Sequence, residues 1–418
     1  MKIKIHRGNE IEYALGKPAT VDYTLVEIAT ETTKIILECG WNLPPTDNNA
    51  AFGDVKIEGL TMGSSTYNAV FVTHHHSSHH GIIESINTDI PIYMSSDTKN
   101  VLDVIADFSD APLPRVDKYL EHGRRENVGD ISILPISVDH RVMGRMLLLV
   151  EADGRKLLYT QGFKHIDPAY YAMIGKIDAL LCEAIYIGAP DDVPISDIEH
   201  EAAQIMKRTT GHVFVFCSAT DAERIKYIER ACRMAGRTLA IDPFLKSIQE
   251  RVTNPLFIEP VGFIPPNMEM TPRIQKHMSS NRDMEFVDVD YYSSLEIAAK
   301  MTNLTFIVRQ SSTDFVACMD KLTPLNGSTL ISVIWEEYKN VKPVRQFIDQ
   351  CELHGMQIET LNAISHGYGR QLKTAILQLD PTVLVPMHNR GVELFTDCLD
   401  RVITLDGNDV LDLKEIYN

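Results

Sequence analysis

Residues 69–81 read AVFVTHHHSSHHG, a short apolar run followed by a dense group of histidines. Such an apolar run is typical of a buried strand that ends in a loop. Alternate residues on an extended segment share a face, so His74 and His76 are predicted to aim their imidazoles at one point, with His79 at the opening of the next helix. Imidazole is a common zinc ligand, so the segment predicts a metal site at a strand end.

Two distant histidines stand in similar places. His140 lies in the segment SVDHR and His388 in VPMHN, and each follows a strand-like run. Either one alone is typical of an ordinary surface or core histidine. Together with the group at residues 74–79, they predict a site assembled from several parts of the chain.

Other short apolar runs also end abruptly in polar residues, as buried strands do. They are residues 35–37, 156–159, 179–182, 213–216 and 383–385. Apolar spacing near 3.6 residues predicts helices between some of them, such as residues 221–235 and 371–379. The fold class is therefore predicted to be α/β. The segment from about residue 193 to 356 alternates helix and strand as a unit of its own.

Bulk properties limit the class of protein. A chain of 418 residues is expected to form two domain-sized units. It has no uninterrupted apolar run of about eighteen residues, so no membrane span is predicted, and its start does not resemble a signal peptide. The net charge of −17 counts against strong non-specific binding of nucleic acid. The seven cysteines form no CxxC pair, which predicts a reducing compartment, the cytoplasm.

The histidine segment resembles the H-x-H-x-D-H signature of the metallo-β-lactamase superfamily. The rest of the chain resembles the β-CASP branch, which includes ribonuclease J-like nucleases. Further motifs follow in the family's order: LECG at 37–40, His140, YTQGFK at 159–164, Glu183, GHVFVFCSATDAER at 211–224, SHG at 365–367, and residues 381–388. Each match is weak alone, and their common order carries the resemblance.

The resemblance implies a four-layer αββα sandwich with an inserted β-CASP-like α/β domain. The sandwich would take residues 1–190 and 356–418, and the insert residues 191–355. The metal ligands implied by the family positions are His74, His76, His79, His140 and His388. Glu183 would orient a ligand, and His366 would contact the scissile phosphate or act as a general acid.

The chain departs from the family pattern at metal-binding carboxylates. Ser78 stands where the signature has aspartate, and Gly162 stands where the family has a bridging aspartate. The imidazoles of His74, His76 and His140 can still hold one zinc ion. His79 and His388 would be left for a second ion, and two neutral ligands without a carboxylate hold an ion poorly. We therefore expect one zinc ion and a second site that is empty or filled only at high metal concentration. Glu38, in place of another aspartate, is expected to accept a hydrogen bond from a ligand histidine.

Three functions remain open at this stage. The first is a metal-dependent hydrolase of the β-CASP type, in which metal-bound hydroxide attacks a phosphodiester of RNA or single-stranded nucleic acid. The second is a catalytically impaired relative that serves as a binding or scaffold subunit. It would form a homo-oligomer or pair with an active paralogue. The third is a mono-zinc hydrolase of a small ester or phosphoester.

Overall fold

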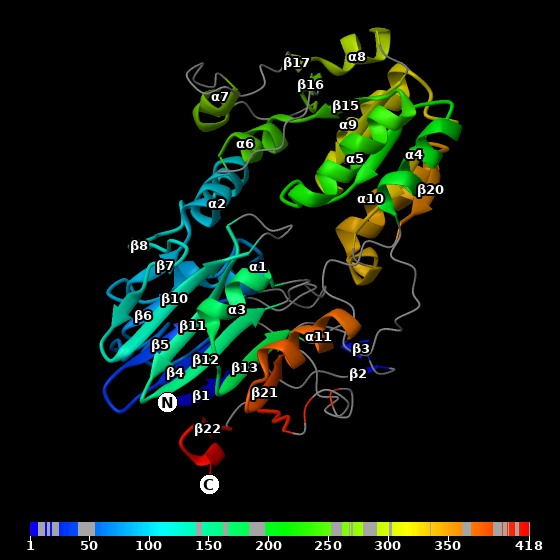
Figure 1. Ribbon diagram of the computed structural model, residues 1–418. Coiled ribbons are helices and arrows are strands. Elements are labelled where there is room, and N and C mark those ends of the chain that lie inside the picture. The colour runs from blue at the N-terminus through cyan, green and yellow to red at the C-terminus, as the bar shows by residue number, and fades with distance from the viewer. Residues whose placement is uncertain are drawn as a thin grey trace.

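The structure is a computed structural model with several sheets and many helices (Figure 1), and it confirms the α/β class. It describes residues 1–6, 13–14, 17–18, 25–40, 55–138, 144–161, 166–183, 197–251, 261–266, 268, 271–278, 291–300, 303–334, 336–361, 369–387, 395, 399, 401–405 and 409–417. Among these residues, no helix is long and apolar enough to cross a bilayer.

The first sheet has seven strands and mixed direction. Its strands, in spatial order, are β22 (Leu411–Asp412), β1 (Lys2–Ile5), β4 (Val26–Ala29), β5 (Lys34–Leu37), β6 (Ala69–Phe71), β7 (Ile92–Met94) and β8 (Lys118–Tyr119). The pairs from β22 to β5 are antiparallel, and those from β5 to β8 are parallel. A separate short pair joins β2 (Tyr13–Ala14) to β3 (Lys17–Pro18).

The second sheet has six strands. Their order is β21 (Val383–Met387), β13 (Ala179–Glu183), β12 (Arg155–Gln161), β11 (Met146–Ala152), β10 (Ile131–Ser137) and β9 (Glu126–Val128). β21 comes late in the sequence, yet it pairs in parallel with β13, and Figure 1 shows it in orange beside that strand. The chain therefore returns to this sheet after a long excursion.

The first two sheets share one hydrophobic core. Ile35 and Phe71 of the first sheet belong to the same buried cluster as Leu148 and Leu181 of the second. Helices cover the outer faces: α2 (Ser96–Ser109) packs on the first sheet, and α3 (Pro168–Ile174) and α11 (Gly369–Leu379) pack on the second. Layers of helix thus enclose a pair of sheets. The remaining short helical turns are α1 (Ser77–His80), η1 (Ile83–Ser85) and η5 (Glu415–Tyr417).

The third sheet consists of seven parallel strands. They are β17 (Tyr291–Tyr292), β16 (Val261–Phe263), β15 (Thr238–Ile241), β18 (Leu304–Val308), β14 (Val213–Phe216), β19 (Thr329–Ser332) and β20 (Gln357–Thr360). Fully buried strands such as β14 and β18 suit a sheet covered on both faces. β20 lies just past residue 355, and the domain boundaries stay a prediction.

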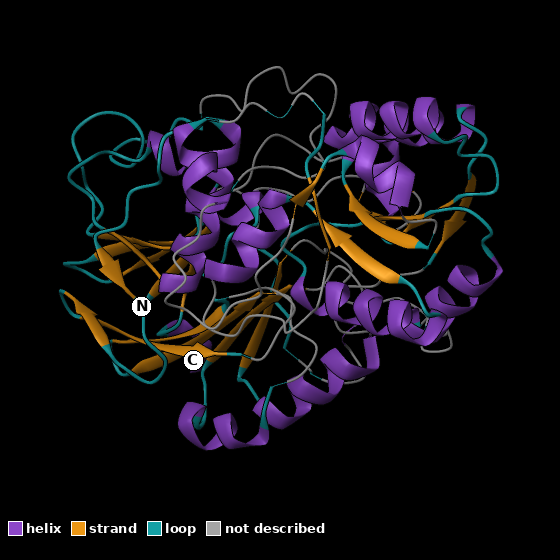
Figure 2. Ribbon diagram, turned by 90° about the horizontal axis from the view of Figure 1, so that it is seen from above, coloured by secondary structure: helices purple, strands orange, loops and turns teal. Residues whose placement is uncertain are grey.

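Helices lie on both faces of the third sheet (Figure 2). This part of the chain forms the helices α4 (Ile198–Arg208), α5 (Ala222–Ala235), α6 (Pro243–Arg251), α7 (Pro272–Met278), α8 (Ser294–Lys300), η2 (Gln310–Ser312), α9 (Thr313–Leu322), η3 (Glu336–Asn340) and α10 (Lys342–Leu353). Of these, α7 lies against α6 and α2. The fully buried Val101 and Val104 of α2 cluster with Ile248 of α6. Asn100 of α2 also donates a 2.8 Å hydrogen bond to the carbonyl of Arg251. This contact joins the third-sheet unit to the paired sheets.

Candidate metal centre

Two neighbouring parallel strands bring the candidate ligands to the same edge of the first sheet. Glu38 directly follows β5, and Thr73 and His74 follow β6 after one more residue. Because β5 and β6 run in parallel, their carboxyl ends open at the same edge. The short helix α1 begins a few residues later and carries His79. The apolar runs seen in the sequence therefore end where the polar groups meet.

A close backbone approach ties this edge together. The amide of Cys39 donates to the carbonyl of His79 at 2.8 Å, and the amide of Ile82 donates to the carbonyl of Cys39 at 2.9 Å. A Cβ atom on Gly40 would lie 1.5 Å from the carbonyl oxygen of Ser78. Only glycine permits this approach. Gly40 thus lets Glu38 and His79 come together.

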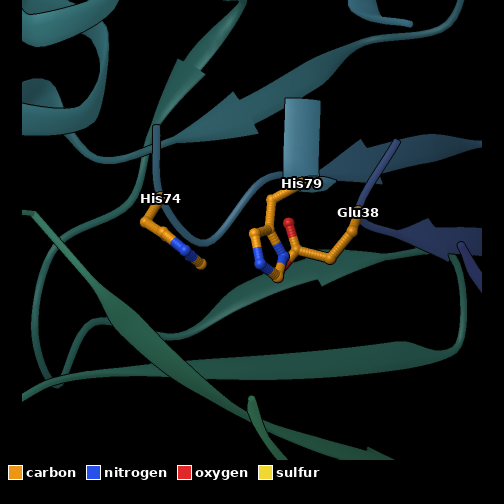
Figure 3. A group of neighbouring side chains, drawn as sticks. All are labelled: Glu38, His74 and His79. Atoms are coloured by element: carbon orange, nitrogen blue, oxygen red, sulfur yellow. The ribbon is translucent and has the colours of Figure 1, made fainter. Parts of the chain in front are cut away.

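Three side chains form the candidate centre shown in Figure 3: Glu38, His74 and His79. Each offers one donor atom, and these atoms all lie within 4.8 Å of one another. The rings of His74 and His79 are 3.9 Å apart between centroids, and Nδ1 of His79 lies 3.4 Å from Oε1 of Glu38. All three residues are buried. Two imidazoles and a carboxylate in this arrangement offer ligands that suit zinc.

Thr73 orients two of the three ligands. Its amide donates to Oε2 of Glu38 at 3.0 Å, and its hydroxyl donates to Oε1 of the same carboxylate. The hydroxyl oxygen also lies 3.0 Å from Nδ1 of His74. A hydroxyl has one proton, so the nitrogen of His74 is the donor in that second bond. This tautomer leaves Nε2 of His74 with a lone pair that can bind a metal ion.

The electrostatic environment keeps His74 neutral. Burial holds its pKa well below the ordinary value of 6.5, and the nearby His79 and Arg145 lower it further. A neutral imidazole is the form that binds a metal ion. The burial that disfavours a charged His74 therefore prepares it as a ligand.

Two residues at strand ends hold backbone conformations that side chains rarely adopt. Glu38 has a φ of 67° and Gln161, the last residue of β12, has a φ of 53°. Both are fully buried. Such a conformation costs about 1–3 kcal/mol and is concentrated at functional sites. Neither amide atom of the Gln161 side chain has a hydrogen-bond partner within the described part of the chain.

Of the other predicted site residues, the structure describes His76 and Glu183. His76 is exposed and stands outside the group, although its ring lies 4.8 Å from that of His74. Glu183 ends β13 and is 9% exposed. His140, His366 and His388 lie outside the described residues, as does Gly162. Their assignment as ligands or catalytic groups stays a prediction.

Glu38 and Arg145 are more closely involved in the centre than the sequence predicts. Oε1 of Glu38 lies 3.4 Å from Nδ1 of His79, but this nitrogen has no hydrogen-bond partner among the described residues, so the expected acceptor role is not seen there. Glu38 instead stands among the donor atoms of the group itself. Arg145, which the sequence analysis did not single out, is 2% exposed and lies near Glu38 and Glu183. One signal was available: a charged residue stands directly before the apolar run of β11.

Comparison with known proteins gives distant relatives. No family model matches the chain. It is 24% identical to ribonuclease J of Sinorhizobium meliloti over 238 residues, which are 53% of this chain and 41% of that protein. It is 25% identical to transcription termination factor FttA of Methanothermobacter thermautotrophicus over 207 residues, 43% of this chain and 32% of that protein. The chain thus spans less than half the length of these curated relatives.

A solved structure resembles the whole chain. The crystal structure of a protein of unknown function from Enterococcus faecalis V583 superposes with a TM-score of 0.71. The match covers 98% of this chain and 99% of that one, at 17% sequence identity. At this identity the likeness concerns the fold alone. The chain is therefore an α/β protein with one candidate histidine–glutamate metal centre among its described residues and with distant relatives that include a ribonuclease.

Proposed function

We propose that this protein is a metal-dependent hydrolase of the β-CASP type that cleaves phosphodiester bonds of RNA or single-stranded nucleic acid. The observation that carries the proposal is the buried group of Glu38, His74 and His79 at adjacent strand ends. The relative named ribonuclease J supports the substrate class. The sequence motifs resemble the same branch of the superfamily.

The arrangement of the sheets supports the fold side of the proposal. Two sheets share a core and carry helices on their outer faces, and a separate parallel sheet is formed between β13 and β21 in the sequence. We propose that residues 1–190 and 356–418 form the metallo-β-lactamase sandwich and that residues 191–355 form the β-CASP-like insert. The centre lies at an edge of the first sheet, where the parallel strands β5 and β6 end.

The residues present fit one zinc ion. His74 offers Nε2 because its Nδ1 is engaged by Thr73, and His79 offers a ring nitrogen within 4.8 Å of the other two donor atoms. The carboxylate of Glu38 supplies negative charge beside these neutral ligands. A zinc ion held there would polarise the phosphoryl group and lower the pKa of water to about 7.

The chain's own groups would bind and orient. Thr73 holds the carboxylate of Glu38 with two hydrogen bonds, and Oε1 of this carboxylate lies 3.4 Å from Nδ1 of His79. Glu183 is proposed to orient a ligand from the second sheet, and His366 to contact the scissile phosphate as general acid. His76, His140 and His388 are proposed as additional ligands.

A metal-binding and cleavage assay tests the proposal. Purified wild-type protein is expected to hold about one tight zinc ion per chain and to hydrolyse single-stranded RNA. His74→Ala is expected to lose both properties. His200→Ala is the matched control, because that histidine lies on α4 with a side chain 62% exposed, and it should change neither.

Other results would point to the other functions. Metal-free, inactive protein would contradict the proposal and favour a scaffold subunit. Turnover of a small chromogenic ester without RNA cleavage would favour a mono-zinc esterase. The double variant Ser78→Asp/Gly162→Asp should raise the zinc content and the cleavage rate, because it restores the carboxylates of the family pattern. No gain in either quantity would show that these positions are not the ones that face the metal.

A further inference from the structure

Arg145 is a buried cation that the proposed mechanism does not use. It immediately precedes β11 and is 2% exposed. The amide of the next residue, Met146, donates to the carbonyl of Thr73 at 3.2 Å, so Arg145 sits beside the segment that carries His74. Its own carbonyl accepts a 3.3 Å hydrogen bond from the amide of Val138. Its backbone is therefore fixed on both sides.

The preceding residue is anchored as well. The carbonyl of Gly144 accepts hydrogen bonds from the hydroxyls of Ser95 at 2.7 Å and Thr98 at 3.3 Å, at the start of α2. Gly144 has a φ of 72°, and a Cβ atom there would lie 2.6 Å from the Ser95 hydroxyl. The sequence Gly144-Arg145 thus places the guanidinium by a backbone that cannot easily move.

The carboxylates of Glu183 and Glu38 favour the charged form of Arg145. Burial lowers its pKa, while the carboxylates of Glu183 and Glu38 act in the opposite direction. Nε of Arg145 has no hydrogen-bond partner within the described residues. A buried guanidinium is tolerated only when negative groups compensate its charge. Glu38 follows β5 of the first sheet and Glu183 ends β13 of the second, and both carboxylates act electrostatically on the guanidinium. The amide of Met146 on Thr73 places Arg145 beside the segment whose Thr73 holds Glu38.

We propose that Arg145 is a fixed internal cation that neutralises Glu38 and Glu183 and thereby limits the centre to one divalent ion. The inference rests on the proposed function, in which the centre holds zinc. A second ion near these carboxylates would meet the repulsion of the guanidinium as well as the absence of carboxylates at Ser78 and Gly162. Arg145 acts here as a positioning residue that sets metal content.

The test measures the zinc bound per chain at saturation, by equilibrium dialysis and elemental analysis. Arg145→Met is expected to bind about one more ion than the wild type, because the charge is gone while an unbranched apolar chain fills the space. Arg145→Lys keeps a positive charge and is expected to retain the wild-type number. Arg155→Met is the matched control and should keep the wild-type number of ions. Arg155 pairs with Asp178 and begins β12, whereas Gln161 ends this strand.

The outcomes separate this inference from the proposed function. One ion in both the wild type and Arg145→Met overturns the inference and leaves the function standing. No ion in the wild type and about one in Arg145→Met overturns both, because the inference starts from a centre that already holds one ion. No ion in either removes both. An added ion in Arg145→Lys would show that shape rather than charge sets the count, and this result also overturns the inference.

If Arg145→Met does not fold without metal, its thermal unfolding with and without zinc still tests the inference. Removing the guanidinium leaves a surplus of buried negative charge, so Arg145→Met is expected to melt at a lower temperature in chelator than the wild type. Added zinc should restore cooperative unfolding, and it should raise the melting temperature more than in the wild type. Failure of zinc to recover the fold would count against the inference.

Discussion

Gly40→Ala should disrupt the candidate metal centre without touching a ligand. The new methyl carbon would lie 1.5 Å from the carbonyl oxygen of Ser78 and 2.7 Å from the amide nitrogen of His79. Real Cβ atoms essentially never come within 3.0 Å of another atom, so the two segments must separate by about 1.5 Å. That shift breaks the 2.8 Å bond from Cys39 to His79. Overpacking costs about 1–3 kcal/mol and the lost hydrogen bond about 1 kcal/mol more.

Gly40→Ala should also weaken zinc binding. Moving His79 away from Glu38 is comparable to losing a supporting group of a ligand, which lowers metal affinity about 10–100-fold. Competition with a chromogenic zinc chelator measures this, and thermal unfolding in chelator measures stability. Gly154→Ala is the control: it has a φ of 69° but nothing within 4 Å, so it should lose about 1–2 kcal/mol of stability with unchanged zinc affinity. Unaltered zinc binding in Gly40→Ala would refute the close approach.

Further predictions concern stability elsewhere. Burial raises the pKa of Glu27, but hydrogen bonds from His6 and Tyr67 outweigh it and lower the pKa to about 2. Stability from this carboxylate is therefore present above its ordinary pKa of 4.5 and lost as pH falls toward 2. Glu27→Gln should unfold more easily at pH 7, by up to about 3 kcal/mol, and acid titration should show the difference vanish near pH 2; a difference that persists there contradicts the assignment. Ile248→Ala should lower the free energy of unfolding by about 2–5 kcal/mol. It should also speed amide hydrogen exchange in α2, because Ile248 packs against Val101 and Val104 of that helix. Unchanged exchange would show that α6 does not support that helix.

The sequence predicts the central strands well because burial leaves a strong local signal. The runs before Glu38, at residues 179–182 and at residues 213–216 became β5, β13 and β14. The Pro-rich region after residue 252 was less regular in sequence, and its short strands β16 and β17 were missed. β16 (VGF) and β17 (YY) lack the uninterrupted apolar run that marked β6 in the sequence.

The site was harder to predict because it depends on contacts between distant segments. The alternation argument placed His74 and His76 on one face, but α1 begins directly after His76, and its ring is exposed. The pairing of Glu38 with His79 follows from the close approach at Gly40, which no local pattern announces. Arg145 was missed for the same reason, since its partners come from two different sheets.

The helix α2 links two parts of the molecule mechanically. Its first turn holds the carbonyl of Gly144 through Ser95 and Thr98, and its later turns carry Val104 against Ile248 of α6 (Figure 1). Any force that shifts the third-sheet unit while α6 stays packed on α2 will pull on the peptide that precedes the buried arginine. A displacement of the third-sheet unit on ligand binding would thus be passed through helix α2 to the surroundings of Arg145.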